Sequence, residues 1–201
     1  MNSKILDAKL KVIDCVHSSY LTGLQTGSGG NFSSRLDGTD LVVIKPTGFS
    51  FIECTVDNLA VVDLLGKQIE GPSKPSSELL THLEIYKHRK DILGIMHCHS
   101  PWSIAYAEAY DDIKSITYDF QKKIGEVPIL RTGDRMAITE MDISKMFLNN
   151  PKLQAFVHSR HGIFAFGSSL MKARFNAELI VETIQTALIM NILKNSPRRN
   201  L

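Results

Sequence analysis

The sequence predicts an α/β fold in which a mixed, mainly antiparallel sheet is covered by helices on its faces. Segments with helical and with strand periodicity interleave along the chain, and several predicted strands are joined by turns of hairpin length. A chain of 201 residues with 43% hydrophobic residues can bury one sizeable core. We therefore expect one domain that spans residues 1–201.

The first half of the chain predicts a helix, a loop, three strands and a second helix. Apolar residues recur at spacings of three and four over residues 5–25, which indicates an amphipathic helix, and the glycines of 26–31 then predict a loop. Pro75 and two serines precede a helical pattern over 79–86, as is typical of a helix N-terminus. Apolar runs between turn residues predict strands at 32–36, 41–45 and 59–64.

The second half repeats this interleaving. Apolar residues at helical spacing predict helices at 101–109, 139–148 and 170–193, the last with an apolar side that can be buried against the sheet. Short apolar runs predict strands at 91–99, 115–118, 127–130 and 156–166, the last of them bent at Gly162.

Composition excludes several classes of protein. The net charge of +2 comes from scattered basic residues, so we expect no nucleic-acid partner. No apolar run is long enough to span a bilayer, and the N-terminus has no signal-peptide pattern, so we expect no membrane and a cytoplasmic location. The three cysteines are widely spaced and form no CxxC pair, which fits reduced thiols.

The segment 94–100 holds the most informative motif. Side chains alternate along a strand, so His97 and His99 share one face while Cys98 points to the other. Alternatively, one histidine packs locally and the other lies on the surface. We favour a shared metal ion, because two buried imidazoles without a ligand leave polar atoms unsatisfied.

Two further groups can complete a metal site. His161 lies beside Gly162, where the backbone can bend around an ion or substrate, and His158 competes with it for this role. Glu78 can be an ordinary first-turn glutamate of a helix; beside a divalent ion it can ligate the metal or act as a general base. Histidines and a carboxylate are the set that zinc catalysis uses.

Small hydrogen-bond donors recur in three separate segments, 29–31, 46–48 and 76–77. Each is an ordinary turn or cap signal by itself, but together with a metal set they suggest a cradle for phosphate. The candidate residues are Asn31, Thr47, Gly48, Ser76 and Ser77.

These motifs occur in an order that resembles the class II aldolase/adducin family, and the resemblance covers nearly the whole chain. It is carried by Gly29-Gly30-Asn31, Lys45-Pro46-Thr47-Gly48, Lys74-Pro75-Ser76-Ser77-Glu78, His97-Cys98-His99-Ser100 and His161-Gly162. The resemblance implies a three-layer sandwich with helices on both faces of the sheet. It also implies a homo-oligomer, with a cyclic tetramer favoured, whose active sites lie between neighbouring subunits.

The resemblance also implies a role for each candidate residue. His97, His99 and His161 would bind Zn²⁺ or another divalent metal, and Glu78 would be the acid/base, with a fourth-ligand role in the resting site left open. The five donors of the cradle would bind the phosphate of a phosphorylated ketose. Tyr118 matches a tyrosine that acts as an acid across a subunit boundary; the alternative, a packing residue on a strand, has equal weight.

We therefore expect a zinc-dependent aldolase that cleaves a phosphorylated ketose to a triose phosphate and an aldehyde through a metal-stabilised enediolate. The same intermediate supports a dehydratase, an epimerase or a decarboxylase. A third alternative is a non-catalytic, adducin-like assembly module. The family's aldolase and epimerase carry a further tyrosine in a C-terminal extension, whereas residues 194–201 contain no aromatic residue, which disfavours the epimerase most.

Overall fold

A single eight-stranded sheet runs through the computed structural model, which describes residues 2–135 and 137–195. The strand order is β4-β3-β2-β1-β5-β8-β7-β6, and the pairing is antiparallel except between β6 and β7. The strands are β1 (Asn31–Arg35), β2 (Leu41–Ile44), β3 (Ala60–Asp63), β4 (Gln68–Glu70), β5 (Gly94–Cys98), β6 (Ile129–Leu130), β7 (Ala155–His158) and β8 (Gly162–Gly167). The predicted mixed, mainly antiparallel sheet is confirmed.

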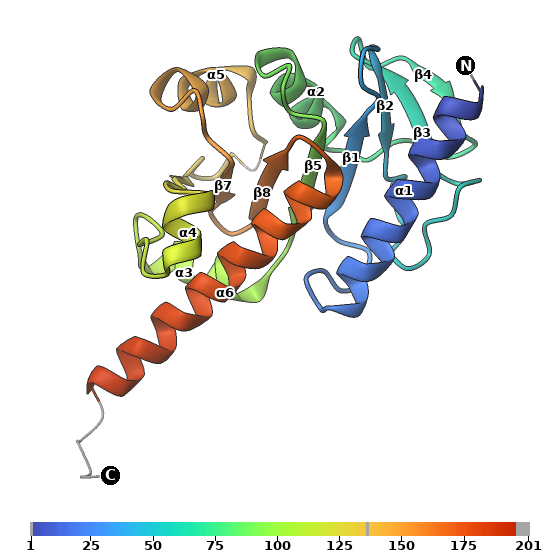
Figure 1. Cartoon of the computed structure of the whole chain (residues 1–201). Coiled ribbons are helices and arrows are strands. Elements are labelled where there is room, and N and C mark those ends of the chain that lie inside the picture. Colours follow the sequence, from blue (N-terminus) through green and yellow to red (C-terminus); the bar gives the residue numbers. More distant parts are fainter. Residues whose placement is uncertain (1, 136, 196–201) are drawn as a thin grey trace.

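Helices cover both faces of this sheet. They are α1 (Asn2–Leu21), α2 (Leu79–His88), α3 (Pro101–Ala109), α4 (Tyr118–Lys123), α5 (Glu140–Asn149) and α6 (Leu170–Asn195). On one face α1, α3, α4 and α6 enclose a core that includes Val43, Met96 and Cys98, and α1 and α6 run across this face in Figure 1. On the other face α2 and α5 enclose a second core that includes Val42 and Ile95. The result is the expected three-layer sandwich.

The structure differs from the sequence prediction in three elements. The prediction of a strand at 115–118 was wrong. Thr117 caps the helix α4 by accepting a hydrogen bond from the backbone N–H of Phe120, and Tyr118 is the first helical residue. The edge strand β4 was not predicted, because it has only three residues, all of them exposed and only one of them apolar. The predicted single strand 156–166 is the hairpin of β7 and β8.

That hairpin reverses at a tight turn. Arg160 takes a left-handed φ of 60°, and Gly162 takes a φ of 145°. A Cβ atom at position 162 would lie 2.2 Å from the carbonyl oxygen of Cys98, so only glycine fits here. Gly162 therefore lets the turn lie directly against the end of β5.

Among the described residues, we find no helix with both the length and the apolar character that crossing a membrane requires.

Candidate active site

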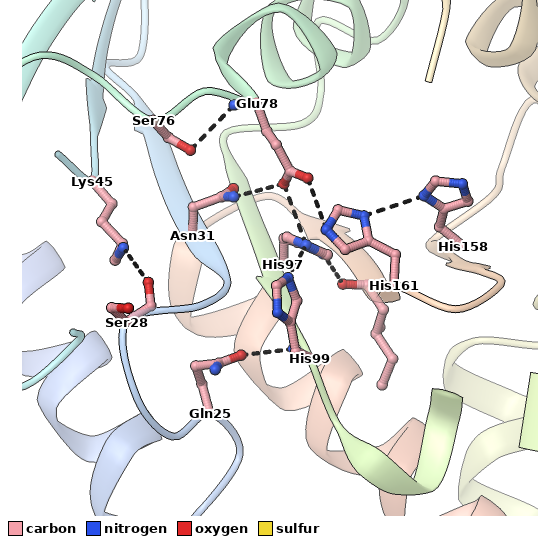
Figure 2. A network of polar contacts seen from close by, with 11 residues as sticks. Gln25, Ser28, Asn31, Lys45, Ser76, Glu78, His97, His99, His158 and His161 are labelled. Atoms are coloured by element: carbon pink, nitrogen blue, oxygen red, sulfur yellow. Dashed lines mark hydrogen bonds and ion pairs between the residues drawn. The ribbon is translucent and has the colours of Figure 1, made fainter. Parts of the chain in front are cut away.

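Three histidines from two parts of the chain converge at one end of the sheet. His97 is on β5, His99 follows that strand, and His161 lies in the turn before β8 (Figure 2). One nitrogen from each ring lies within 4.8 Å of the others. The Nε2 atoms of His97 and His99 are 2.9 Å apart. Cys98 points into the opposite core, where burial raises the pKa of its thiol to about 12.

The sheet holds His97 in one orientation. Its ring stacks on that of Phe164, with centroids 3.9 Å apart, and its Nδ1 lies 2.9 Å from the carbonyl oxygen of Ile163. A carbonyl can only accept, so Nδ1 carries the hydrogen and Nε2 presents a lone pair to the other histidines. This is the tautomer that binds a metal through Nε2.

Glu78 brings a carboxylate into the same cluster from the N-terminus of α2. Its Oε1 lies 3.1 Å from Nε2 of His161, and its Oε2 lies 3.3 Å from Nε2 of His97. Asn31 pairs with His97 in the β1–β5 register and donates its side-chain N–H to Oε2 of Glu78 at 2.6 Å. The Oδ1 of Asn31 is buried and has no hydrogen-bond partner among the residues that the structure describes.

The electrostatics of the cluster favour a cation. Burial, reinforced by the neighbouring His161 and His99, lowers the pKa of His97 well below its usual 6.5, and burial lowers that of His99 to about 4. Both rings are therefore neutral at pH 7, and the Nε2 lone pair of His97 faces Nε2 of His99. Nitrogens about 2.0–2.1 Å from a tetrahedral ion lie roughly 3.4 Å apart, which falls between the 2.9 Å of the His97–His99 pair and the 4.8 Å within which the ligand nitrogens of all three histidines lie. Three imidazoles and a carboxylate fit a divalent metal ion.

A cavity of about 150 Å³ adjoins the cluster, with His99, His161 and Glu78 in its wall. All five residues expected to bind phosphate line it: Asn31, Thr47, Gly48, Ser76 and Ser77. Two backbone hydrogen bonds between the segments 45–48 and 74–78 bring these donors together, from Thr47 to Lys74 at 3.0 Å and from Ser76 to Lys45 at 2.9 Å. The structure thus unites the three donor segments in one pocket.

Two residues of the site were not assigned a role from the sequence. Lys45 is only 3% exposed, lines the same cavity, and donates from Nζ to the carbonyl oxygen of Ser28 at 3.1 Å. The sequence feature that could have identified Lys45 as a site residue is its position between a buried strand and Pro46. Gln25 fixes the backbone at His99, because its Oε1 accepts a hydrogen bond from the backbone N–H of His99 at 2.6 Å.

Two other candidates lie apart from the cavity. Tyr118 is 74% exposed, and Lys122 lies over its ring, so it joins no group of the site within this chain. His158 is not in the histidine cluster but lies behind His161, with 3.2 Å between their Nδ1 atoms. Residues 194–201 contain no aromatic residue. Of these, residues 196–201 lie outside the described part of the chain.

Comparison with known proteins agrees with the fold. The profile of the Class II Aldolase and Adducin N-terminal domain matches residues 10–188. The L-ribulose-5-phosphate 4-epimerase UlaF of Salmonella paratyphi B is 31% identical over 191 residues, which cover 90% of this chain and 84% of that protein.

Solved structures give the same result. The crystal structure of YgbL from Escherichia coli superposes with a TM-score of 0.81 and 27% identity over 98% of this chain and 94% of the other. An L-fuculose 1-phosphate aldolase superposes with a TM-score of 0.81 and 25% identity over 97% of this chain and 91% of the other. The chain therefore belongs to the class II aldolase and adducin family.

Proposed function

We propose that this protein is a zinc-dependent aldolase that cleaves a phosphorylated ketose to a triose phosphate and an aldehyde. The observation that supports it most strongly is the convergence of three histidine nitrogens and the Glu78 carboxylate at the wall of a pocket lined with anion-binding groups. A divalent ion held by His97, His99 and His161 would polarise the ketose carbonyl and stabilise the charge of the enediolate.

The pocket would hold the substrate by its phosphate. The Lys45 ammonium supplies positive charge, the hydroxyls of Thr47 and Ser76 supply donors, and the N-terminus of α2 faces the same space. A phosphate fixed there positions the carbon chain against the histidine cluster. The binding energy of the phosphate thus aligns the bond to be broken.

Glu78 would move the proton at the enediolate carbon. Its carboxylate lies in the wall of the pocket, and the N–H of Asn31 holds it in one orientation. In its protonated form a carboxyl group fixed in this way can give its proton to the carbon after cleavage, and the resulting carboxylate can remove that proton in the reverse direction.

Tyr118 would act in a neighbouring subunit of a homotetramer, where it would accept the proton of the hydroxyl group that becomes the aldehyde during cleavage and would return that proton to the oxygen in the reverse direction. The high exposure of its ring leaves it accessible to another copy of the chain. Tyr118 does not line the cavity of its own chain, so this role requires assembly of several copies.

A second candidate is a 4-epimerase, favoured by the 31% identity to L-ribulose-5-phosphate 4-epimerase UlaF. Cleavage, rotation of the aldehyde and addition to its other face would invert one carbon with the same groups. The two functions differ in whether the aldehyde leaves before the bond forms again, and in which fragment carries the phosphate: the aldehyde fragment in L-ribulose 5-phosphate and the triose fragment in L-fuculose 1-phosphate.

Product analysis with L-fuculose 1-phosphate and L-ribulose 5-phosphate tests the proposal, with and without chelator and with Zn²⁺ added back. Release of dihydroxyacetone phosphate and an aldehyde from L-fuculose 1-phosphate, lost on chelation and restored by Zn²⁺, is the expected result. Formation of a 4-epimer without free aldehyde would select the epimerase. Loss of water or of carbon dioxide instead would reject both, and a protein that binds no metal and turns over neither sugar would be an assembly module.

A further inference from the structure

His158, the last residue of β7, links the histidine cluster to a second polar group. Its ring is fully buried. Its Nδ1 lies 3.2 Å from Nδ1 of His161, and its Nε2 lies 2.9 Å from Oγ1 of Thr132. Figure 2 shows the two rings side by side, with His161 between His158 and Glu78. The proposed reaction assigns no role to His158 or Thr132.

The local backbone creates this arrangement. The turn after β7 closes with a hydrogen bond of 3.1 Å from the N–H of His161 to the carbonyl oxygen of His158, which folds the two rings edge to face at a centroid distance of 5.3 Å. The parallel pairing of β6 with β7 sets Leu130 beside His158. Thr132, two residues further on, then reaches the far nitrogen of the His158 ring.

The direction of these hydrogen bonds determines what His161 can bind. The Nε2 of His161 faces Glu78 at 3.1 Å and belongs to the histidine cluster. An imidazole that binds an ion through Nε2 carries its hydrogen on Nδ1, and here that hydrogen can be donated to Nδ1 of His158. His158 then carries its own hydrogen on Nε2 and donates it to Thr132, whose hydroxyl oxygen can accept.

The opposite direction is incompatible with ligation. If His158 donated from Nδ1, the Nδ1 of His161 would accept, and the hydrogen of His161 would lie on Nε2, directed at Glu78. That hydrogen would occupy the lone pair that a metal ion needs. The tautomer of His158 is therefore coupled to that of His161, so a preference at His158 and Thr132 sets which tautomer His161 adopts.

We propose that His158, supported by Thr132, is a positioning residue that holds His161 in the tautomer able to bind the metal ion. This inference rests on the proposed function, because it takes His161 as a ligand. Partners of this kind at the second nitrogen of a metal-binding histidine typically contribute about 10–100-fold to metal affinity.

Zinc affinity measured by competition with a chromophoric chelator tests the inference. His158→Phe keeps a ring but removes the acceptor, so the affinity should fall by about 10–100-fold. His158→Asn keeps an oxygen near the place of Nδ1 and should stay within about threefold of the unaltered protein. Thr132→Val should weaken binding in the same direction as His158→Phe.

A matched control separates this role from general stability. His17 is a partly buried histidine whose Nε2 lies 2.9 Å from the carbonyl oxygen of Cys54, away from the cavity. His17→Phe should leave zinc affinity unchanged. The free energy of unfolding of each metal-free variant is measured in parallel, because a merely structural role would lower that quantity equally in His158→Phe and His158→Asn and would not separate their zinc affinities.

The tautomers give a second, direct readout. Long-range ¹H–¹⁵N spectra of the zinc-loaded protein should show the hydrogen on Nδ1 of His161 and on Nε2 of His158. A hydrogen on Nδ1 of His158 in that state, or a His158→Phe variant with undiminished affinity, overturns the inference and leaves the proposed function intact. An unaltered protein that binds no Zn²⁺ overturns both.

Discussion

Glu78→Gln separates proton transfer from the other tasks of the site. Glutamine has the same number of heavy atoms, and its carbonyl oxygen can still accept the hydrogen bond that Asn31 donates at 2.6 Å. With that oxygen in the place of Oε2, 3.3 Å from Nε2 of His97, the NH2 group takes the place of Oε1 and faces Nε2 of His161 at 3.1 Å. We therefore expect the fold to survive, with a change of about 1 kcal/mol or less in the free energy of unfolding.

Catalysis should respond far more strongly. Loss of a positioned general base costs about 10²–10⁴-fold in rate, which corresponds to about 3–5 kcal/mol in the activation free energy. The direct assay is exchange of the hydroxymethyl hydrogen of dihydroxyacetone phosphate with solvent deuterium, because it measures proton transfer at the enediolate carbon without the aldehyde.

The matched control is Glu84→Gln on the same helix, where the carboxylate pairs with Lys87 at 2.6 Å instead of facing the cavity. It should exchange at the rate of the unaltered protein. If Glu78→Gln binds Zn²⁺ and also exchanges within threefold of that rate, the assignment of Glu78 as the base is wrong.

Three further predictions concern the metal, the pH and the turn. His99→Ala should abolish zinc retention on dialysis, and stoichiometric zinc by elemental analysis would contradict its ligand role. Without metal, the free energy of unfolding should fall as the pH drops below about 6.5. Burial lowers the pKa of His82 to about 3 and that of His99 to about 4, so below pH 6.5 the unfolded state binds more protons than the folded state. Equal stability against urea at pH 7.5 and pH 5 would refute this. Gly162→Ala places Cβ 2.2 Å from the carbonyl oxygen of Cys98, whereas nothing lies within 4 Å of the Cβ that Gly38→Ala adds. Gly38→Ala should lower the free energy of unfolding by the roughly 1–3 kcal/mol of left-handed strain alone, and Gly162→Ala should lower it by more. Equal thermal stabilities of the two variants would exclude this close approach.

Local periodicity predicted much of the fold and part of the site. Strand alternation alone placed His97 and His99 on one face and Cys98 on the other, since side-chain direction depends only on the backbone period. Asn31 was predicted in a loop next to a strand, and it begins β1. The choice of Glu78 as a site residue remains a prediction, although its carboxylate lies beside two of the histidines.

Other features depend on contacts that periodicity does not contain. An apolar run from 156 to 166 reads as one strand, whereas the left-handed Arg160 and the fit of Gly162 against β5 turn it into a hairpin. That reversal brings His161 to the cluster and leaves His158 behind it. At Tyr118 the cap provided by Thr117 and the burial of Phe120 outweighed a weak strand pattern.

The direction of the Cys98 side chain has a consequence for metal selectivity. The thiol is directed into the core beneath α1 and α6, so a site made from the flanking imidazoles and the nearby carboxylate would contain only nitrogen and oxygen donors from these residues. Such a set lacks the soft sulfur that selects copper(I) and iron–sulfur clusters, and divalent ions of the first transition series compete for it in their general order of affinity. Which ion occupies the protein would then be decided by the supply in its surroundings, and purified samples from cells grown on different metals should carry different ions in the same ligand set.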